Sequence, residues 1–256
     1  MNALPVMKPY IGGEWIDSES QKFTTIYDPS TGKPIAQVPQ CTAAEVEKAV
    51  AAAKAAFPAW KNTPVRTRAG IMMKLRGLIE RDKEELTRMV ATENGKCWSE
   101  AAGDVAKALE MTELACSAPS LLMGESLMDT SRGYDTTLYR EPIGVFAGIA
   151  PWNFPAMIPV GWMAPLAIVC GNTFVLKPAS TTPMTSMKFA ELYREDGIPE
   201  GVFNIVPCSR HEAEILLTHP DVRGITFVGS TEVGLHVYST AAAHGKRVQA
   251  LCEAKN

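Results

Sequence analysis

The sequence predicts an α/β fold in which a Rossmann-like parallel sheet carries helices on both faces, with a helical amino-terminal segment before it. Two observations predict this fold. After Tyr134, short apolar stretches alternate with helical stretches about every 25–30 residues, which implies parallel strands joined by crossover helices. The stretch at 143–149 is almost continuously apolar, as expected of a strand that is buried on both faces.

The amino-terminal half is expected to hold short strands followed by three helices. Thr42 begins the first helix, and Glu45 three positions later completes a capping box. Glycine-broken apolar stretches and helical spacing predict the other elements. These are strands at 10–15 and 23–27, a helix that carries apolar residues from 71 to 89, and a helix at about 99–116.

The carboxyl-terminal half is expected to supply the sheet. Its expected strands lie at 136–140, 143–149, 173–176, 202–206, 224–228 and 247–251, and its expected helices at 159–169, 182–195, 210–218 and 231–243. In an open parallel sheet, ligands bind beyond the carboxyl ends of the strands. Three loops emerge at such ends, after 143–149, 173–176 and 224–228, so we expect a binding site there.

The composition argues against several classes of partner. The chain has 256 residues, with 46% hydrophobic and 21% charged residues and a formal net charge of −3, which are ordinary values for a soluble globular protein. This charge gives no global attraction to nucleic acid or to an anionic membrane. No charged residue occurs between 142 and 176, but five prolines interrupt this stretch, so we do not expect it to span a membrane.

The cysteines and histidines favour neither a disulfide nor a metal site. None of the six cysteines forms a CxxC pair, and the first ten residues lack the pattern of a secretory signal. Reduced thiols in the cytoplasm are therefore expected. The four histidines have no partners at ligand spacing, so no metal is expected either.

The loop Pro151-Trp-Asn-Phe-Pro155 follows the strand at 143–149 and holds one amide, Asn153, between two prolines and two aromatic rings. An asparagine NH₂ can donate to an oxygen that gains negative charge during acyl chemistry, and preorganisation makes this interaction worth several kcal/mol. An asparagine that only caps a rigid turn is the alternative, and the residues alone do not decide between them.

The other two loops carry a lysine and a helix start. Lys177 ends its strand, where it can meet a ribose hydroxyl or a phosphate unless it simply reaches solvent. Ser180 is neutral, whereas a carboxylate there would repel a 2′-phosphate, so NADP stays possible beside NAD. Gly229 turns a strand into a helix with Ser230 as N-cap, which suits pyrophosphate but is weak evidence alone. The sequence matches neither GxGxxG nor a Walker motif, which disfavours P-loop phosphoryl transfer.

Taken together, PWNFP, KPAS and FVGSTEVG, in this order and spacing, resemble the aldehyde dehydrogenase superfamily. The likeness covers essentially the whole chain and includes the segments YIGGEW, DPSTGKPIAQVP and PEGVFNIVP. The ending VQALCEAKN is similar to the CoA-acylating, methylmalonate-semialdehyde branch. This resemblance implies oxidation of a short semialdehyde, of the malonate or methylmalonate type, with NAD or NADP through a cysteine thioester that passes to CoA.

The resemblance also implies a role for residues of each loop. Asn153 would be the oxyanion-hole amide. Ser180 stands where relatives that prefer NAD often carry a glutamate. The implied cofactor contacts are Ala150, Pro151 and Trp152 at the nicotinamide, Lys177 and Ser180 at the ribose, Gly229, Ser230 and Thr231 at the diphosphate, and Val233 at the adenine.

Two departures limit the resemblance. Hydrolytic members carry a glutamate that activates water, and alignment on Lys255 places Leu251 there. Only a two-residue slip, roughly 6–7 Å along a strand, would bring Glu253 to that position. The acylating branch also lacks this glutamate because CoA takes the acyl group. The nucleophilic cysteine is expected beyond Asn256, and Cys252 is expected to be structural or incidental, so this chain alone should be inactive.

Three functions therefore stay open. The whole chain, 1–256, is expected to be the NAD(P)-binding domain of an acylating aldehyde dehydrogenase, with about 130–142 as an oligomerisation strand and the catalytic domain absent. The alternatives are a fragment of a hydrolytic dehydrogenase and a natural, non-catalytic paralogue that binds nucleotide or a partner subunit. Aldehyde and CoA would be partners only of a full-length protein. Apolar surface left uncovered predicts a homo-oligomer or a poorly soluble species.

Overall fold

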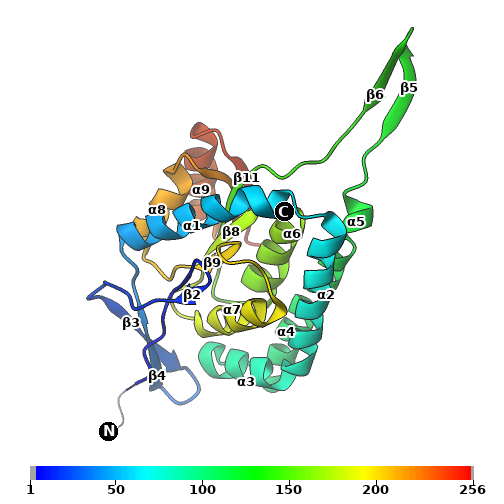
Figure 1. Ribbon diagram of the computed structural model, residues 1–256. Coiled ribbons are helices and arrows are strands. Elements are labelled where there is room, and N and C mark those ends of the chain that lie inside the picture. Colours follow the sequence, from blue (N-terminus) through cyan, green and yellow to red (C-terminus); the bar gives the residue numbers. More distant parts are fainter. Residues whose placement is uncertain (1–3, 255–256) are drawn as a thin grey trace.

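The computed structural model describes residues 4–254 and centres on a seven-stranded sheet (Figure 1). In spatial order, its strands are β11 (Arg247–Cys252), β10 (Val222–Gly229), β7 (Val145–Ile149), β8 (Thr173–Lys177), β9 (Phe203–Ile205), β1 (Tyr10–Ile11) and β2 (Glu14–Trp15). The strands from β11 to β9 pair in parallel, whereas β1 and β2 extend one edge in antiparallel orientation. The predicted α/β fold with a parallel sheet is confirmed.

Helices cover both faces of this sheet, as predicted. One core joins a face of the sheet to α1 (Ala43–Lys61), α8 (Arg210–Thr218) and α9 (Thr231–Ala243). The second core joins the opposite face to α2 (Val65–Arg81), α4 (Trp98–Cys116), α6 (Ala164–Val169) and α7 (Met184–Asp196). Val175 lies in the first core and its neighbours Phe174 and Leu176 in the second, because successive side chains of a strand point to opposite faces.

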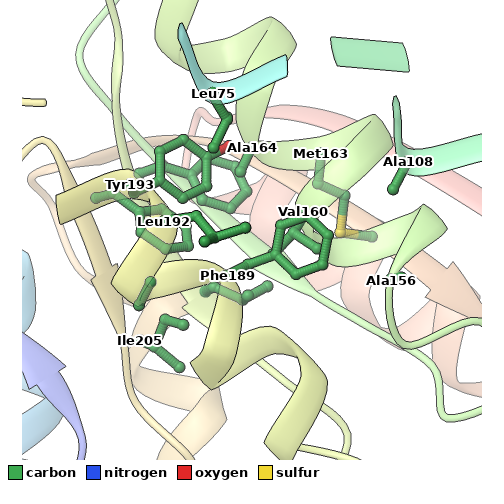
Figure 2. Packing of buried hydrophobic residues seen from close by; sticks show 14 of the residues in the cluster. Leu75, Ala108, Ala156, Val160, Met163, Ala164, Phe189, Leu192, Tyr193 and Ile205 are labelled. Carbon is green, nitrogen blue, oxygen red and sulfur yellow. The ribbon is translucent and has the colours of Figure 1, made fainter. Parts of the chain in front are cut away.

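Large side chains of α7 fill part of the second core. Figure 2 shows Leu192 and Tyr193 of α7 in one cluster with Leu75 of α2. The Tyr193 ring also packs against Phe203 of β9, with 4.4 Å between the ring centroids. Each fully buried side chain of this size contributes about 1.5–3 kcal/mol. This packing fixes α7, and with it the loop that follows β8.

The amino-terminal helices differ from the prediction in number. Both bonds of the expected capping box are present at α1, from Glu45 N to Thr42 Oγ1 and from Thr42 N to Glu45 Oε2. The single helix expected at 71–89 is instead α2 and α3 (Lys83–Asn94), which meet at Asp82. Ile79 and Leu86 are both fully buried and lie seven positions apart, which is about two turns of one helix. The apolar spacing of a single helix therefore continues across the break, and the sequence does not reveal it.

A second hairpin in this half was only partly predicted. β3 (Phe23–Asp28) pairs with β4 (Lys33–Pro39), and the turn between them is held by Asp28, whose carboxylate accepts from Ser30 N at 2.8 Å. Strand β4 was not predicted from the sequence. Its prolines at 34 and 39 argue against a strand, but this two-stranded sheet leaves open edges where a missing N–H is tolerated.

Prolines also reshape the helix expected at 159–169. This segment is a π-helix, η1 (Met157–Met163), followed by the short α6. Pro159 and Pro165 lack the N–H groups that a regular α-helix would use here. Gly161 lets η1 approach α4 closely, since a Cβ at this position would lie 2.8 Å from Cα of Ala108. The helices expected at 210–218 and 231–243 are confirmed at their predicted ends.

A long hairpin projects away from the body of the molecule (Figure 1). It consists of β5 (Ser126–Ser131) and β6 (Tyr134–Thr137) and follows the short helix α5 (Ala118–Leu121). The strand expected at 136–140 was therefore wrong at its far end, where residues 138–140 are irregular. Every residue of both strands is exposed.

Three further properties of the described residues bear on membranes, disulfides and metals. None of the helices in the described part of the chain has the length and apolar character needed to cross a bilayer. All six cysteines are free thiols. Between residues 4 and 254, no group of three or more histidine, cysteine, aspartate or glutamate side chains is arranged to hold a metal ion.

Candidate functional site

The carboxyl ends of three strands lie side by side at one edge of the sheet. Ile149 of β7 pairs with Lys177 of β8 on one side and with Phe227 of β10 on the other. The loops that follow these strands therefore emerge together, as the strand-end rule requires.

A cavity of about 750 Å³ opens among the loops after β7, β10 and β11. Its lining includes Pro151, Trp152, Asn153, Gly229, Ser230, Leu251 and Glu253. The Asn153 side chain is exposed and makes no hydrogen bond within residues 4–254, so its amide is available to a ligand. The Trp152 ring is also exposed, at 62%. Two of the three predicted loops thus converge on one cavity.

The start of α9 borders this cavity. Ser230 is the N-cap, as predicted, but its side chain makes no capping hydrogen bond. The carboxylate of Glu253 instead accepts from Thr231 N at 3.3 Å. A carboxylate is stabilised there because the N-terminal end of a helix carries partial positive charge. Gly229 is needed at the turn, since a Cβ would lie 2.5 Å from the Phe227 ring.

A second cavity of about 190 Å³ lies between β7, β8, α8 and α9. It is lined by Ile149, Lys177, Arg210, Ala213, Glu214, Leu217, Val233, His236 and Val237. Burial lowers the pKa of Lys177, although the nearby Cys208 acts in the opposite direction. Within the described residues, the side chains of Lys177 and Arg210 form no ion pair. Two cationic groups therefore face one cavity, while Glu214 is occupied by His236 at 2.7 Å.

Arg210 was missed by the sequence analysis. It is the first residue of α8, directly after the N-cap Ser209. Nothing in its local sequence separates it from an ordinary exposed arginine at a helix start. Its place beside Lys177 depends on how α8 packs against the sheet, so only the structure reveals it.

Three of the predicted contact residues line neither cavity. Ala150 is buried, and its N–H donates to the Lys177 carbonyl at 3.1 Å. Ser180 is exposed in the loop after β8. Thr231 contributes its N–H to Glu253. Their predicted roles at a cofactor stay predictions, as do those of the residues that line the cavities.

The end of the described chain bears on the question of hydrolysis. Leu251 and Glu253 both line the larger cavity, so the candidate positions for a water-activating group lie at the same site. Lys255 and Asn256, on which the alignment rests, lie outside the described residues. Cys252 ends β11 half-buried, with its sulfur against the position of Gly234.

These features define a site at the carboxyl edge of a parallel sheet, with an amide in one loop and a helix start in another. Residues 15–256 match the aldehyde dehydrogenase family, and the chain belongs to that family. The fold and the resemblance inferred from the sequence are thereby confirmed.

Individual similar proteins carry names that are narrower than that of the family. The chain is 52% identical over 250 residues to malonate-semialdehyde dehydrogenase 2 of Geobacillus kaustophilus, which covers 98% of this chain and 51% of the relative. The methylmalonate-semialdehyde dehydrogenase of Oceanimonas doudoroffii superposes with a TM-score of 0.95 at 40% identity, over 99% of this chain and 51% of that one. A Sinorhizobium meliloti protein in complex with NAD, provisionally assigned to the same activity, superposes with a TM-score of 0.95 at 38% identity. This superposition covers 100% of this chain and 52% of that one.

The lengths of these proteins matter as much as the identities. The chain spans about half the length of the curated relatives it matches. The match is therefore to one portion of an aldehyde dehydrogenase.

Proposed function

We propose that this chain is the cofactor-binding portion of an aldehyde dehydrogenase that uses NAD, with NADP also accepted. The observation that carries this proposal is the shared cavity, in which Asn153 and the start of α9 at Ser230 face the same space. The diphosphate would accept from the N–H groups at the start of α9, where it would take the place of the Glu253 carboxylate at Thr231 N. The nicotinamide end would lie beside Trp152, and the adenosine end would lie toward Lys177 and Val233 in the smaller cavity.

Asn153 is the residue to which we assign a catalytic role. Its NH₂ would donate to the aldehyde oxygen as negative charge develops there during attack on the carbonyl carbon. NAD(P), when bound, supplies the acceptor for the hydride that leaves the same carbon. The nucleophile would be a cysteine in the remaining half of the protein. None of the six cysteines here lines the larger cavity, and burial raises the pKa of Cys208 to about 12 and that of Cys41 further.

The activity proposed for the whole protein is oxidation of a malonate- or methylmalonate-type semialdehyde to an acyl-CoA. The names of its relatives support this substrate class. Leu251 in the cavity supports acyl transfer to CoA, because an apolar side chain cannot activate water.

A hydrolytic activity is the second candidate, because Glu253 lines the same cavity. Its carboxylate would have to leave Thr231 N in order to act as a general base. Dependence of the full-length enzyme on CoA separates the two candidates. Turnover that is unchanged without CoA would favour hydrolysis.

Acceptance of NADP is supported by the charges in the smaller cavity. Lys177 and Arg210 supply positive charge there without an ion-pair partner among the described residues. Ser180 adds no negative charge to the loop after β8. A 2′-phosphate carries negative charge and would be attracted by such a pair of cations.

The β5–β6 hairpin is proposed as the oligomerisation element. Met128 is 75% exposed, Tyr134 70% and Leu127 62%, on a segment that stands clear of the body (Figure 1). Exposed apolar side chains in such number are typical of protein–protein contacts. Light scattering should find more than one chain per particle, and a monodisperse monomer would contradict this.

The test of the proposed function is calorimetric titration of the purified chain with NAD and with NADP, followed by an assay with short aldehydes. We expect saturable binding of both nucleotides and no turnover. Absence of binding would contradict the cofactor site. Dehydrogenase activity from this chain alone would contradict the proposal that the nucleophilic cysteine lies in the remaining half of the protein. Mass spectrometry of the natural product would show whether the chain occurs by itself.

A further inference from the structure

The loop that carries Asn153 is held by a segment distant in sequence. Asn94, the last residue of α3, donates from Nδ2 to the Trp152 carbonyl at 2.7 Å. Thr182, in the loop after β8, donates from its hydroxyl to the same carbonyl at 3.2 Å. One carbonyl next to Asn153 is thus fixed from two sides.

An ion pair holds the other side of Asn153. Lys96 Nζ lies 3.9 Å from the centroid of the Phe154 ring and 3.0 Å from Oδ2 of Asp104. The second oxygen of Asp104 accepts from Met157 N at 2.7 Å, where η1 begins. The Asp104 side chain is fully buried and that of Lys96 is 15% exposed.

The same segment also fixes the neighbouring loop. Glu93 is buried, and its carboxylate accepts from Met184 N and Thr185 N, both at 2.8 Å, at the start of α7. The loops after β7 and β8 therefore rest on a common support, which we call the 93–96 segment. Within this arrangement the Trp152 carbonyl and the Phe154 ring are held, whereas the Asn153 amide itself makes no hydrogen bond within residues 4–254.

A purely structural role does not explain this construction well. A buried ion pair is costly to desolvate, and well-packed apolar side chains of similar size often stabilise a fold equally or better. The pair does restrict the conformation of the loop, because a carboxylate that accepts from two fixed donors is compatible with few loop geometries. Preorganisation of a hydrogen-bond donor is what makes that donor effective in catalysis.

We propose that Asn94, Lys96 and Asp104 are positioning residues that hold Trp152 and Asn153 in the geometry that receives the nicotinamide end of the cofactor. This inference rests on the proposed function, because it requires a dinucleotide in the larger cavity. It predicts that these residues affect the nicotinamide end only. The adenosine end would lie in the smaller cavity, which no residue of the 93–96 segment lines.

The variant Asn94→Ala tests this inference with two ligands, NAD and ADP. ADP has the adenosine and diphosphate but no nicotinamide, so it reports on the rest of the site. Loss of one hydrogen bond to the loop should weaken NAD binding by about five-fold and leave ADP binding within about two-fold of wild type. Asn62→Ala, at the exposed C-cap of α1, is the matched control and should change neither affinity.

A second pair of variants separates positioning from bulk stability. Lys96→Met removes the charge and should weaken NAD selectively, whereas Lys96→Arg keeps the charge over Phe154 and should restore most of the affinity. Equal losses for NAD and ADP, or no loss for either in Asn94→Ala, would overturn the inference. Should Lys96→Met fail to fold, the result for Asn94→Ala decides. Wild-type protein that binds neither ligand would overturn the proposed function as well, a pattern distinct from failure of the inference alone.

Discussion

Two regions of the larger cavity are built in opposite ways. The loop around Asn153 is fixed from outside by Asn94, Lys96 and Asp104, and its functional amide carries no internal partner among the described residues. Among the described residues, the only side-chain hydrogen bond to the start of α9 runs from Thr231 N to the carboxylate of Glu253. One region is preformed and open, whereas the other is occupied by a group that carries the same sign of charge as a diphosphate. Binding of the nicotinamide end should therefore weaken when the contacts that hold the Asn153 loop are removed. Binding of the diphosphate should strengthen when the competing carboxylate of Glu253 is removed.

The largest effect is expected at the buried side of the first region. Asp104→Ala removes the acceptor of Met157 N and leaves Lys96 without its partner, so the free energy of unfolding should fall by about 3–5 kcal/mol. Urea titration of the variant and the wild type measures this difference. The exposed pair Lys107–Glu110 is the matched control, and Glu110→Ala should cost less than about 1 kcal/mol. A similar small cost for Asp104→Ala would show that the loop does not depend on this pair.

Glu93 should make the stability of the same region depend on pH. Burial raises its pKa from 4.5 to about 7, although hydrogen bonds from Thr185 and Met184 act against this. The folded chain then binds a proton more tightly than the unfolded chain. The contribution of Glu93 to stability is therefore greatest below pH 4.5 and is lost as the pH rises through 7, by about 3 kcal/mol.

The variant Glu93→Gln isolates this contribution, because the difference in unfolding free energy from wild type cancels the other titrating groups. The unfolding free energy of the wild type, relative to that of Glu93→Gln, should be higher at pH 4.5 than at pH 7. A difference that stays constant over this range would mean that Glu93 is ionised in the folded chain throughout.

A smaller effect is expected at the adenosine end. Arg210→Gln removes one of the two cations in the smaller cavity and should weaken binding of NADP by about ten-fold, with NAD changed by less than about two-fold. Calorimetric titration with both nucleotides measures the ratio. Arg223→Gln, an exposed change on β10 outside that cavity, serves as control. Equal weakening of NAD and NADP would remove Arg210 from the discrimination of the two cofactors.

The smallest effect is expected at the start of α9, where the change should strengthen binding. A single charge near a helix end is worth about 0.3–1 kcal/mol, so Glu253→Gln should tighten NAD binding by about two- to five-fold at low salt. Glu232→Gln changes the same charge in the first turn of α9 but does not line the cavity. If both variants bind NAD equally well, the gain is general electrostatics and Glu253 does not compete with the diphosphate.

The features that were predicted correctly from the sequence depend on local pattern. The boundaries of α8 and α9 were correct because apolar spacing and a serine N-cap coincide at each. The carboxyl ends of the strands from β7 to β11 were predicted to within one residue, whereas the strand expected at 136–140 was wrong at its far end. Since parallel strands align their carboxyl ends, the meeting of Asn153 with Ser230 followed from the same pattern.

What the sequence analysis missed depends on contacts between distant residues. The break at Asp82 is invisible because Ile79 and Leu86 keep one apolar face across it. Asn94 and Lys96 lie near residue 95, more than fifty positions before the loop they hold, and no local signal marks them. Glu253 gives the same lesson, since its bond to Thr231 arises only where β11 ends beside α9.

Hydrogen–deuterium exchange of the chain with and without NAD tests the central claim most directly. We expect NAD to slow exchange at two separate segments at once, the loop at 150–154 and the start of α9 at 229–233. Protection confined to one of them, or found only elsewhere on the molecule, would contradict a dinucleotide that spans these strand ends.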